Sequence, residues 1–185
     1  MDYLPYMELA RQNLLTSEGN LIPAILLFQN DDLMGAMLAP FKDDEQKYNS
    51  LKAAGVLARK NGCTSALFIC DAAMRKFENA QQAAYAHENW NTEAPLTYPE
   101  GSGVRVECLV LAYLNFKTGE KSNTTQVYKK ENGTYVFGEV TTLTEVTGGV
   151  FNSLVYGYEN PDCSLPVSFI QPGDVLDEPD SDSFN

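Results

Sequence analysis

Cys70 and Asp71 place a possible nucleophile beside a possible base at the point where an apolar run of the chain ends. A cysteine nucleophile needs a base close to it, and that base is most often a histidine. The chain has one histidine, His87, so Cys70 and His87 form the thiol dyad that the sequence allows. Neighbouring residues of a strand point to opposite faces, so Cys70 and Asp71 would not share a site. We therefore expect Cys70 to be a buried structural thiol, and we predict no catalytic residue.

The other cysteines and the acidic clusters also lack the spacing of a metal site. Zinc is bound mostly by cysteine and histidine at short spacings, and four scattered cysteines with one histidine have no such spacing. Residues 31–32 and 43–45 could bind a hard cation. The residues at 31–32 are more typical of a turn, and those at 43–45 are more typical of a helix N-terminus. We expect Cys63, which follows Gly62, to be exposed. We predict no metal site and no cofactor.

The charge of the chain limits the classes of partner. The 185 residues carry a net charge of −12, which disfavours binding to nucleic acid or to an anionic membrane surface and favours a cationic partner. No apolar run reaches the roughly 18 residues of a membrane span. The N-terminus lacks the basic start and apolar core of a signal peptide. We therefore expect a cytoplasmic protein with free thiols.

The hydrophobic pattern and the turn residues predict the order of the elements. Asp43 and Gln46 have the spacing of a capping box, and Asn132-Gly133 is typical of a tight hairpin turn. We expect a helix between Asp2 and Ser17, strands at 21–28 and 33–41, a helix between Asp43 and Asn61, and strands at 65–74, 104–116, 124–130 and 134–140.

This order of helix, hairpin, helix, strand, long loop and meander predicts an α+β fold, with an antiparallel or mixed sheet of about five to six strands and helices packed on it. Residues 141–170 fit either helix or strand. We expect residues 1–170 to form a single globular domain with an elaborated loop at 78–103, and residues 171–185 to form an acidic, disordered tail. The order of elements is similar to that of profilin-like and roadblock-type modules and overlaps the opening of deaminase-like folds, which implies no function.

The segment 78–103 holds the best candidate for a binding site. Loops longer than ordinary connections are often functional, and aromatic side chains on loops anchor partners well. Four suitable residues lie within fourteen positions: Tyr85, His87, Trp90 and Tyr98. The alternative is that Trp90, the only tryptophan, covers an edge of the sheet as part of a small satellite core.

The sequence therefore favours a non-catalytic cytoplasmic interaction module. It would bind a protein partner, preferably a basic one, through an acidic surface and the aromatic loop, as toxin-neutralising immunity proteins do. One alternative is a small hydrolase that uses carboxylates or a thiol, because 25 acidic residues offer many possible pairs. Another is a phage-type acidic inhibitor or DNA mimic, which would need carboxylates along one face, whereas much of this charge lies in the tail.

Replacement of Trp90 by alanine separates its two possible roles. If the indole anchors a partner, Trp90→Ala should abolish partner capture and change the free energy of unfolding by less than about 1 kcal/mol. If the indole covers the sheet, the same change should cost about 3–5 kcal/mol. Iodide quenching of the single indole needs no partner, and we expect strong quenching. An indole shielded from iodide in the purified protein would contradict the anchoring role.

Overall fold

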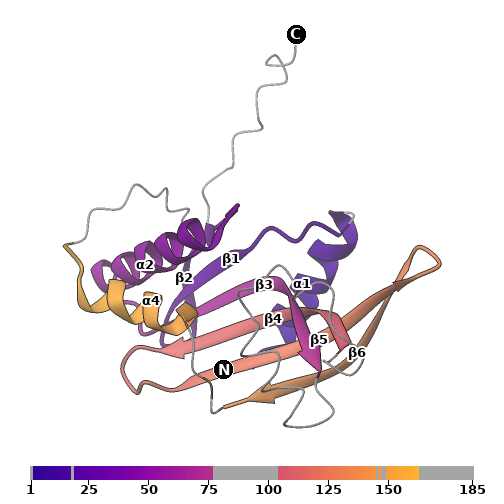
Figure 1. Cartoon of the computed structure of the whole chain (residues 1–185). Coiled ribbons are helices and arrows are strands. Elements are labelled where there is room, and N and C mark those ends of the chain that lie inside the picture. Colours follow the sequence, from indigo (N-terminus) through magenta and orange to yellow (C-terminus); the bar gives the residue numbers. More distant parts are fainter. Residues whose placement is uncertain (1, 18, 77–103, 145, 147–148, 163–185) are drawn as a thin grey trace, which may run out of the picture. The chain divides into compact units, whose positions relative to one another are not determined.

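The computed structural model describes residues 2–17, 19–76, 104–144, 146 and 149–162 (Figure 1). The elements are α1 (Leu4–Thr16), β1 (Ala24–Gln29), β2 (Asp32–Leu38), α2 (Asp44–Lys60), β3 (Ser65–Lys76), β4 (Val104–Asn115), β5 (Lys121–Glu131), β6 (Thr134–Leu143) and α4 (Gly149–Glu159). Within the described ranges the chain thus has three helices and a six-stranded antiparallel sheet, which confirms the predicted α+β class. The strand order is β2-β1-β3-β4-β5-β6, so β2 and β6 are the edge strands. The stretch that fitted either helix or strand contains the helix α4.

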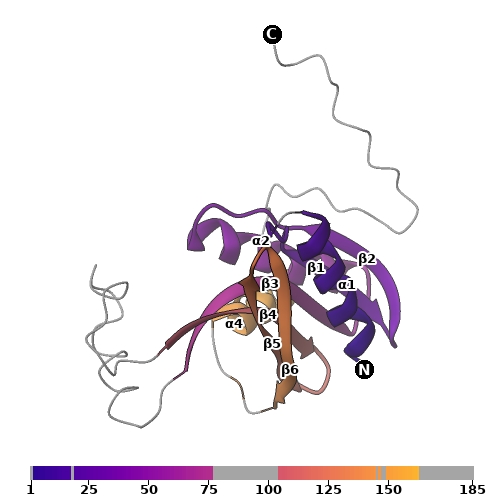
Figure 2. The ribbon, with the colours of Figure 1, turned by 90° about the vertical axis from the view of Figure 1, so that its right-hand side faces the viewer.

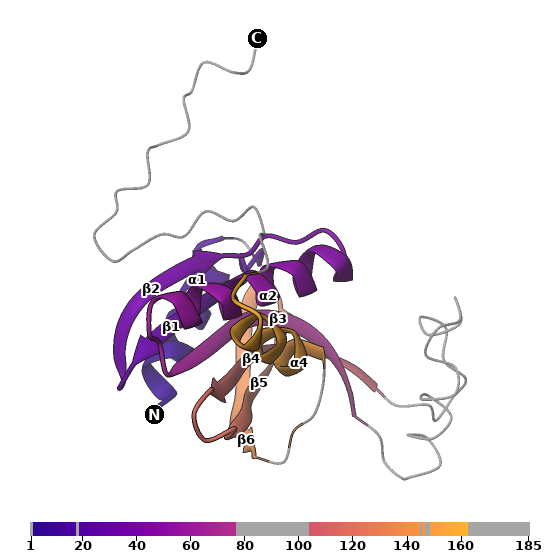
Figure 3. The same ribbon diagram turned by 90° about the vertical axis from the view of Figure 1, so that its left-hand side faces the viewer.

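The described residues divide into two compact units, each assembled from separate stretches of chain. The first unit holds α1, most of β3 and β4, and the β5–β6 hairpin (Figure 2). The second holds the β1–β2 hairpin, α2, α4, the start of β3 and the end of β4 (Figure 3). The single domain over residues 1–170 stays a prediction, and the tail at 171–185 lies outside the described residues.

Both predicted hairpins are present, and their turns use residues that accept a positive φ. Asn30 and Asp31, between β1 and β2, have φ of 51° and 72°. Asn132 and Gly133, between β5 and β6, have φ of 49° and 83°. Two consecutive residues with positive φ make a type I′ turn, whose twist matches that of the paired strands.

Helix α2 begins at the predicted capping pair. The Asp43 carboxylate accepts a hydrogen bond from the Gln46 N–H at 2.8 Å. The Gln46 side-chain oxygen accepts one from the Lys42 N–H at 3.0 Å. Two backbone N–H groups at the helix start, which have no partner within the helix, are thereby satisfied.

The C-terminus of α2 corrects the prediction for Cys63. Gly62, with φ of 66°, donates its N–H to the Arg59 carbonyl at 3.3 Å, and Cys63 donates its N–H to the Ala58 carbonyl at 2.8 Å. These two bonds make a Schellman motif, in which the second residue after the C-cap, here Asn61, commonly packs against the last turn of the helix. Cys63 is accordingly buried, not exposed.

Two glycines allow α2 and α4 to approach each other closely. A Cβ atom on Gly55 would lie 2.7 Å from the backbone nitrogen of Tyr158, and a Cβ atom on Gly157 would lie 2.7 Å from the carbonyl carbon of Lys52. Atoms in packed interiors do not approach to such distances, so a side chain at either position would push the helices apart. Beside this contact the ring of Phe116 stacks on that of Tyr158, with centroids 4.1 Å apart.

Gly157→Ala should lower the free energy of unfolding by about 1–3 kcal/mol, because separating the helices costs more than the gain of up to about 1 kcal/mol in helix propensity. Urea denaturation measures the loss. Asn152→Ala, on the exposed side of α4, is the matched control and should stay within about 0.5 kcal/mol of the wild type. A Gly157→Ala protein as stable as the wild type would show that the two helices do not meet so closely in solution.

Candidate functional site

The aromatic loop lies outside the described residues. Tyr85, His87, Trp90 and Tyr98 all fall within residues 77–103, and Cys163 falls within 163–185. The role of the loop as a contact surface therefore remains a prediction, and His87 of the alternative Cys70–His87 dyad falls on the same segment.

The three described cysteines have the environment of structural thiols. Cys70 is 8% exposed, as predicted for a buried thiol, and Cys63 and Cys108 are buried as well. Burial raises the pKa of Cys63. Burial first, and the carboxylates of Glu107 and Asp71 after it, raise the pKa of Cys108 to about 11. Because the nucleophile is the thiolate, Cys63 and Cys108 are poor nucleophiles at neutral pH.

The two acidic clusters noted in the sequence occupy structural positions. Asp43 caps α2, Asp44 forms an ion pair with Lys47 in the first turn of the helix, and Asp31 lies in a type I′ turn. Over the described ranges, no group of three or more His, Cys, Asp or Glu side chains is placed to hold a metal ion.

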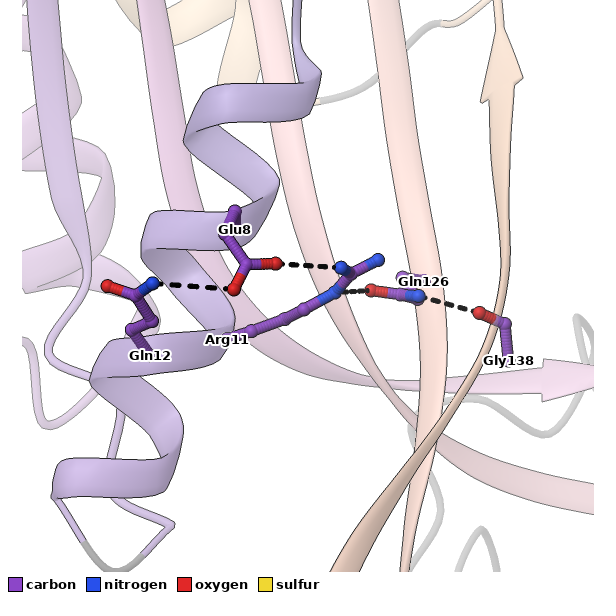
Figure 4. A network of polar contacts seen from close by, with 5 residues as sticks. All are labelled: Glu8, Arg11, Gln12, Gln126 and Gly138. Carbon is purple, nitrogen blue, oxygen red and sulfur yellow. Dashed lines mark hydrogen bonds and ion pairs between the residues drawn. The ribbon is translucent and has the colours of Figure 1, made fainter.

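A partly buried polar network joins α1 to the β5–β6 hairpin (Figure 4). The Arg11 Nε donates to the Gln126 Oε1 at 2.6 Å, and the Gln126 Nε2 donates to the Gly138 carbonyl at 2.6 Å. The Arg11 Nη1 also pairs with the Glu8 Oε2 at 2.8 Å. Arginine can only donate and a carbonyl can only accept, so the partners of Gln126 fix the orientation of its amide.

The network satisfies a carbonyl that an irregularity in β6 exposes. Gln126 is opposite Val140, and Tyr128 is opposite Phe137. Between these two pairs β6 therefore has one residue more than β5. Such a β-bulge disrupts the ladder and turns a backbone group out of it. The amide of Gln126, which is only 3% exposed, takes up the Gly138 carbonyl.

The rest of this face of β5 is also occupied by internal contacts. The Tyr3 hydroxyl lies 3.0 Å from the Ser122 hydroxyl, and the Thr124 hydroxyl lies 3.0 Å from that of Thr142. Ser122, Thr124 and Gln126 are all buried. Since these polar groups are paired with the N-terminal segment and with β6, the face serves to hold those elements rather than to receive a ligand.

A pair of carboxylates on β3 and β4 is the part of the first unit best suited to acid–base chemistry. Asp71 is half-buried, and burial first, with the charge of Glu107 as a smaller cause, raises its pKa. The pKa of Tyr128 is raised to about 12. Burial is the largest cause, and the charges of Asp71 and Glu107 act in the same direction. Perturbed pKa values of this kind occur at functional sites and also in structural clusters. The sequence drew attention to Asp71 but not to Glu107.

The edge strand β2 exposes three large apolar side chains, which we call the hairpin surface: Leu33, Met34 and Leu38, with 44%, 36% and 45% of their area exposed. Leu27 of β1 is opposite Gly35, and Phe28 is opposite Leu33, so Met34 is an extra residue in β2 and forms a bulge. From Leu33 to Leu38 the strand has no charged residue and no proline, the usual devices that protect an edge.

The tip of the hairpin carries two carboxylates. Asp31 and Asp32 are exposed at the tip of the hairpin. The sequence contains no lysine or arginine from residue 12 to residue 41. An apolar edge with carboxylates at one end is therefore the most distinctive surface feature of the second unit.

Asp71→Asn should stabilise the protein more at pH 7 than at pH 4. The pKa of Asp71 is raised in the folded state, so the wild type loses stability as pH rises from the unfolded-state value near 3.8 through the folded-state pKa. The asparagine variant has no proton to lose and escapes this loss. Urea unfolding at the two pH values measures the difference between the variant and the wild type.

Glu139→Gln is the matched control, because Glu139 is an exposed carboxylate of the same unit. It should change the free energy of unfolding by less than about 0.5 kcal/mol at either pH. A difference between Asp71→Asn and the wild type that does not grow from pH 4 to pH 7 would mean that Asp71 is as well solvated as an exposed residue.

None of the described helices is long and apolar enough to cross a membrane. Comparison of the chain with family models, with curated proteins and with solved structures found no match.

Proposed function

We propose that this chain is a non-catalytic, cytoplasmic protein-binding module and that its hairpin surface is a contact site. The observation that carries the proposal is the exposure of Leu33, Met34 and Leu38 along one edge strand. Single exposed leucines are ordinary on protein surfaces, but apolar side chains gathered along one strand edge are costly to leave uncovered.

The backbone of β2 supports the same interpretation. An edge strand presents N–H and C=O groups that have no partner on their outer side within the sheet. An extended segment of another protein can pair with such groups and add a strand, while alternate side chains of that segment pack beside those of the edge. The four residues from Gly35 to Leu38 follow the bulge and keep a regular register with β1, so they offer a short pairing edge.

The described chemistry supports binding more than catalysis. The raised pKa values of Cys63 and Cys108 argue against either as a nucleophile. Two buried thiols of this kind also agree with a reducing compartment, which supports the cytoplasmic location. The net charge of −12 favours a basic partner. Residues 78–103, with their aromatic side chains, are proposed as a second contact.

The alternative function, a small hydrolase that uses carboxylates, is favoured by the pair of Asp71 and Glu107. Asp71 has the raised pKa that a general acid needs. A hydrolase also needs a second group to activate water or attack the substrate. The ionisable groups that interact with Asp71 are Glu107, the protonated thiol of Cys108 and the phenol of Tyr128, as far as the structure describes them. These groups do not supply an activated nucleophile, so this proposal ranks second.

Leu33→Lys should abolish capture of the partner, because a charge on the edge prevents another strand from packing there. The experiment compares proteins captured by the tagged wild type and the tagged variant from an extract of the cells that make this chain. Leu9→Lys is the matched control, because Leu9 on α1 is 45% exposed, close to the 44% of Leu33, and receives the same change.

A protein retained by the wild type and by Leu9→Lys but lost by Leu33→Lys supports the hairpin surface as the contact site. Both variants should unfold within about 1 kcal/mol of the wild type, since both positions are largely exposed. Equal capture by Leu33→Lys and Leu9→Lys would overturn the proposal.

A further inference from the structure

We infer that the partner segment at the hairpin surface is an extended apolar strand with lysine or arginine at the end that lies beside the hairpin turn. The inference rests on the proposed function and adds the chemistry of the partner. It combines three features of one hairpin: the register of β2, its exposed apolar side chains and the charge at its tip.

The register of β2 determines where a partner strand can pair. The bulge at Met34 interrupts the ladder, and regular pairing with β1 covers Gly35 to Leu38. Along these residues Met37 is buried and Leu38 is exposed. Because side chains alternate between faces, every second side chain of a partner strand would lie on the face of the sheet that carries Leu38, and an apolar side chain suits the position beside Leu38.

The same register sets the distance to the charged tip. Asp32 precedes Gly35 by three residues, which is about 10 Å along a strand at about 3.4 Å per residue. A partner strand paired with Gly35 to Leu38 therefore reaches Asp31 and Asp32 with its next two or three residues. Those residues meet two exposed carboxylates and no basic side chain of the hairpin. A lysine or arginine there is attracted, whereas an aspartate or glutamate is repelled.

Charge also decides against a second copy of this chain as the occupant. Two copies each carry a net charge of −12, and β2 of one copy would bring its own Asp31 and Asp32 to the other. Like charges of this size oppose association. A basic segment of a different protein gains from the same field.

Two fluorescein-labelled peptides test the inference by fluorescence anisotropy with the full chain. One is Lys-Lys-Val-Thr-Val-Thr-Val-Lys-Lys, and the other has glutamate in place of every lysine. The basic peptide should bind at least about tenfold more tightly than the acidic one at low salt, with the difference falling as salt screens the charges. The Leu38→Lys variant should not bind the basic peptide.

Two double variants distinguish the effect of the hairpin carboxylates on peptide binding from the effect of the net charge of the chain. The double variant Asp31→Asn, Asp32→Asn should weaken binding of the basic peptide by about fivefold or more, whereas Asp44→Asn, Glu45→Gln, which removes the same charge at the start of α2, should weaken it less than about twofold. Asparagine tolerates the positive φ of residue 31, so the turn should remain intact.

Equal weakening by the two double variants, equal binding of both peptides, or no binding of either would overturn the inference. So would sedimentation showing a dimer that Leu38→Lys dissociates, because a second copy would then be the occupant. If neither peptide binds, but Leu33→Lys fails to capture a protein that the wild type captures, the inferred partner chemistry is wrong and the proposed function stands. If the basic peptide binds but Leu33→Lys captures the same proteins as Leu9→Lys, the proposed function fails.

Discussion

The arrangement of the first unit depends on the two hydrogen bonds that the side-chain amide of Gln126 makes. The amide accepts from Arg11 of α1 on one side and donates to the Gly138 carbonyl of the β6 bulge on the other. A buried amide pays a desolvation cost that only complete pairing offsets, and here both of its ends are paired. The position of α1 on the sheet and the irregularity of β6 are therefore linked through one side chain.

Local signals in the sequence were sufficient for most of the fold. Asn132-Gly133 predicted a type I′ turn, and Asp43 with Gln46 predicted the start of α2, because each depends on residues only a few positions apart. The exposure of Cys63 was predicted wrongly, because a helix-ending glycine does not by itself show where the residue after it points. The glycine before Cys63 indicated a helix end, but the direction of the chain after that glycine follows from the Schellman bonds to Arg59 and Ala58.

The buried polar face of β5 and the carboxylate pair could not be predicted in the same way. Ser122, Thr124 and Gln126 alternate along the strand in a pattern that is typical of a face exposed to solvent. They are buried because their partners come from α1 and β6, at separations of 12 to 119 residues for the bonds of Gln126 and Ser122. The pairing of Asp71 with Glu107 likewise joins β3 to β4 across the long segment 77–103, and no spacing rule connects the two residues.

The two edge strands differ in a way that bears on function. Each contains a bulge, a device that discourages pairing with other chains. In β6 the bulge carbonyl is bound by Gln126, and the strand also carries Glu139 beside it. In β2 the bulge is confined to Met34, and the regular stretch after it has neither charge nor proline. An edge that is protected at only one end leaves the other end able to pair, and we propose that the carboxylates at the hairpin tip favour basic strands among those that could pair. β6 also exposes Val136 and Leu143, but Glu139 lies between them, whereas Leu33, Met34 and Leu38 of β2 have no charged residue between them. For this reason we propose the contact site on β2 rather than on β6.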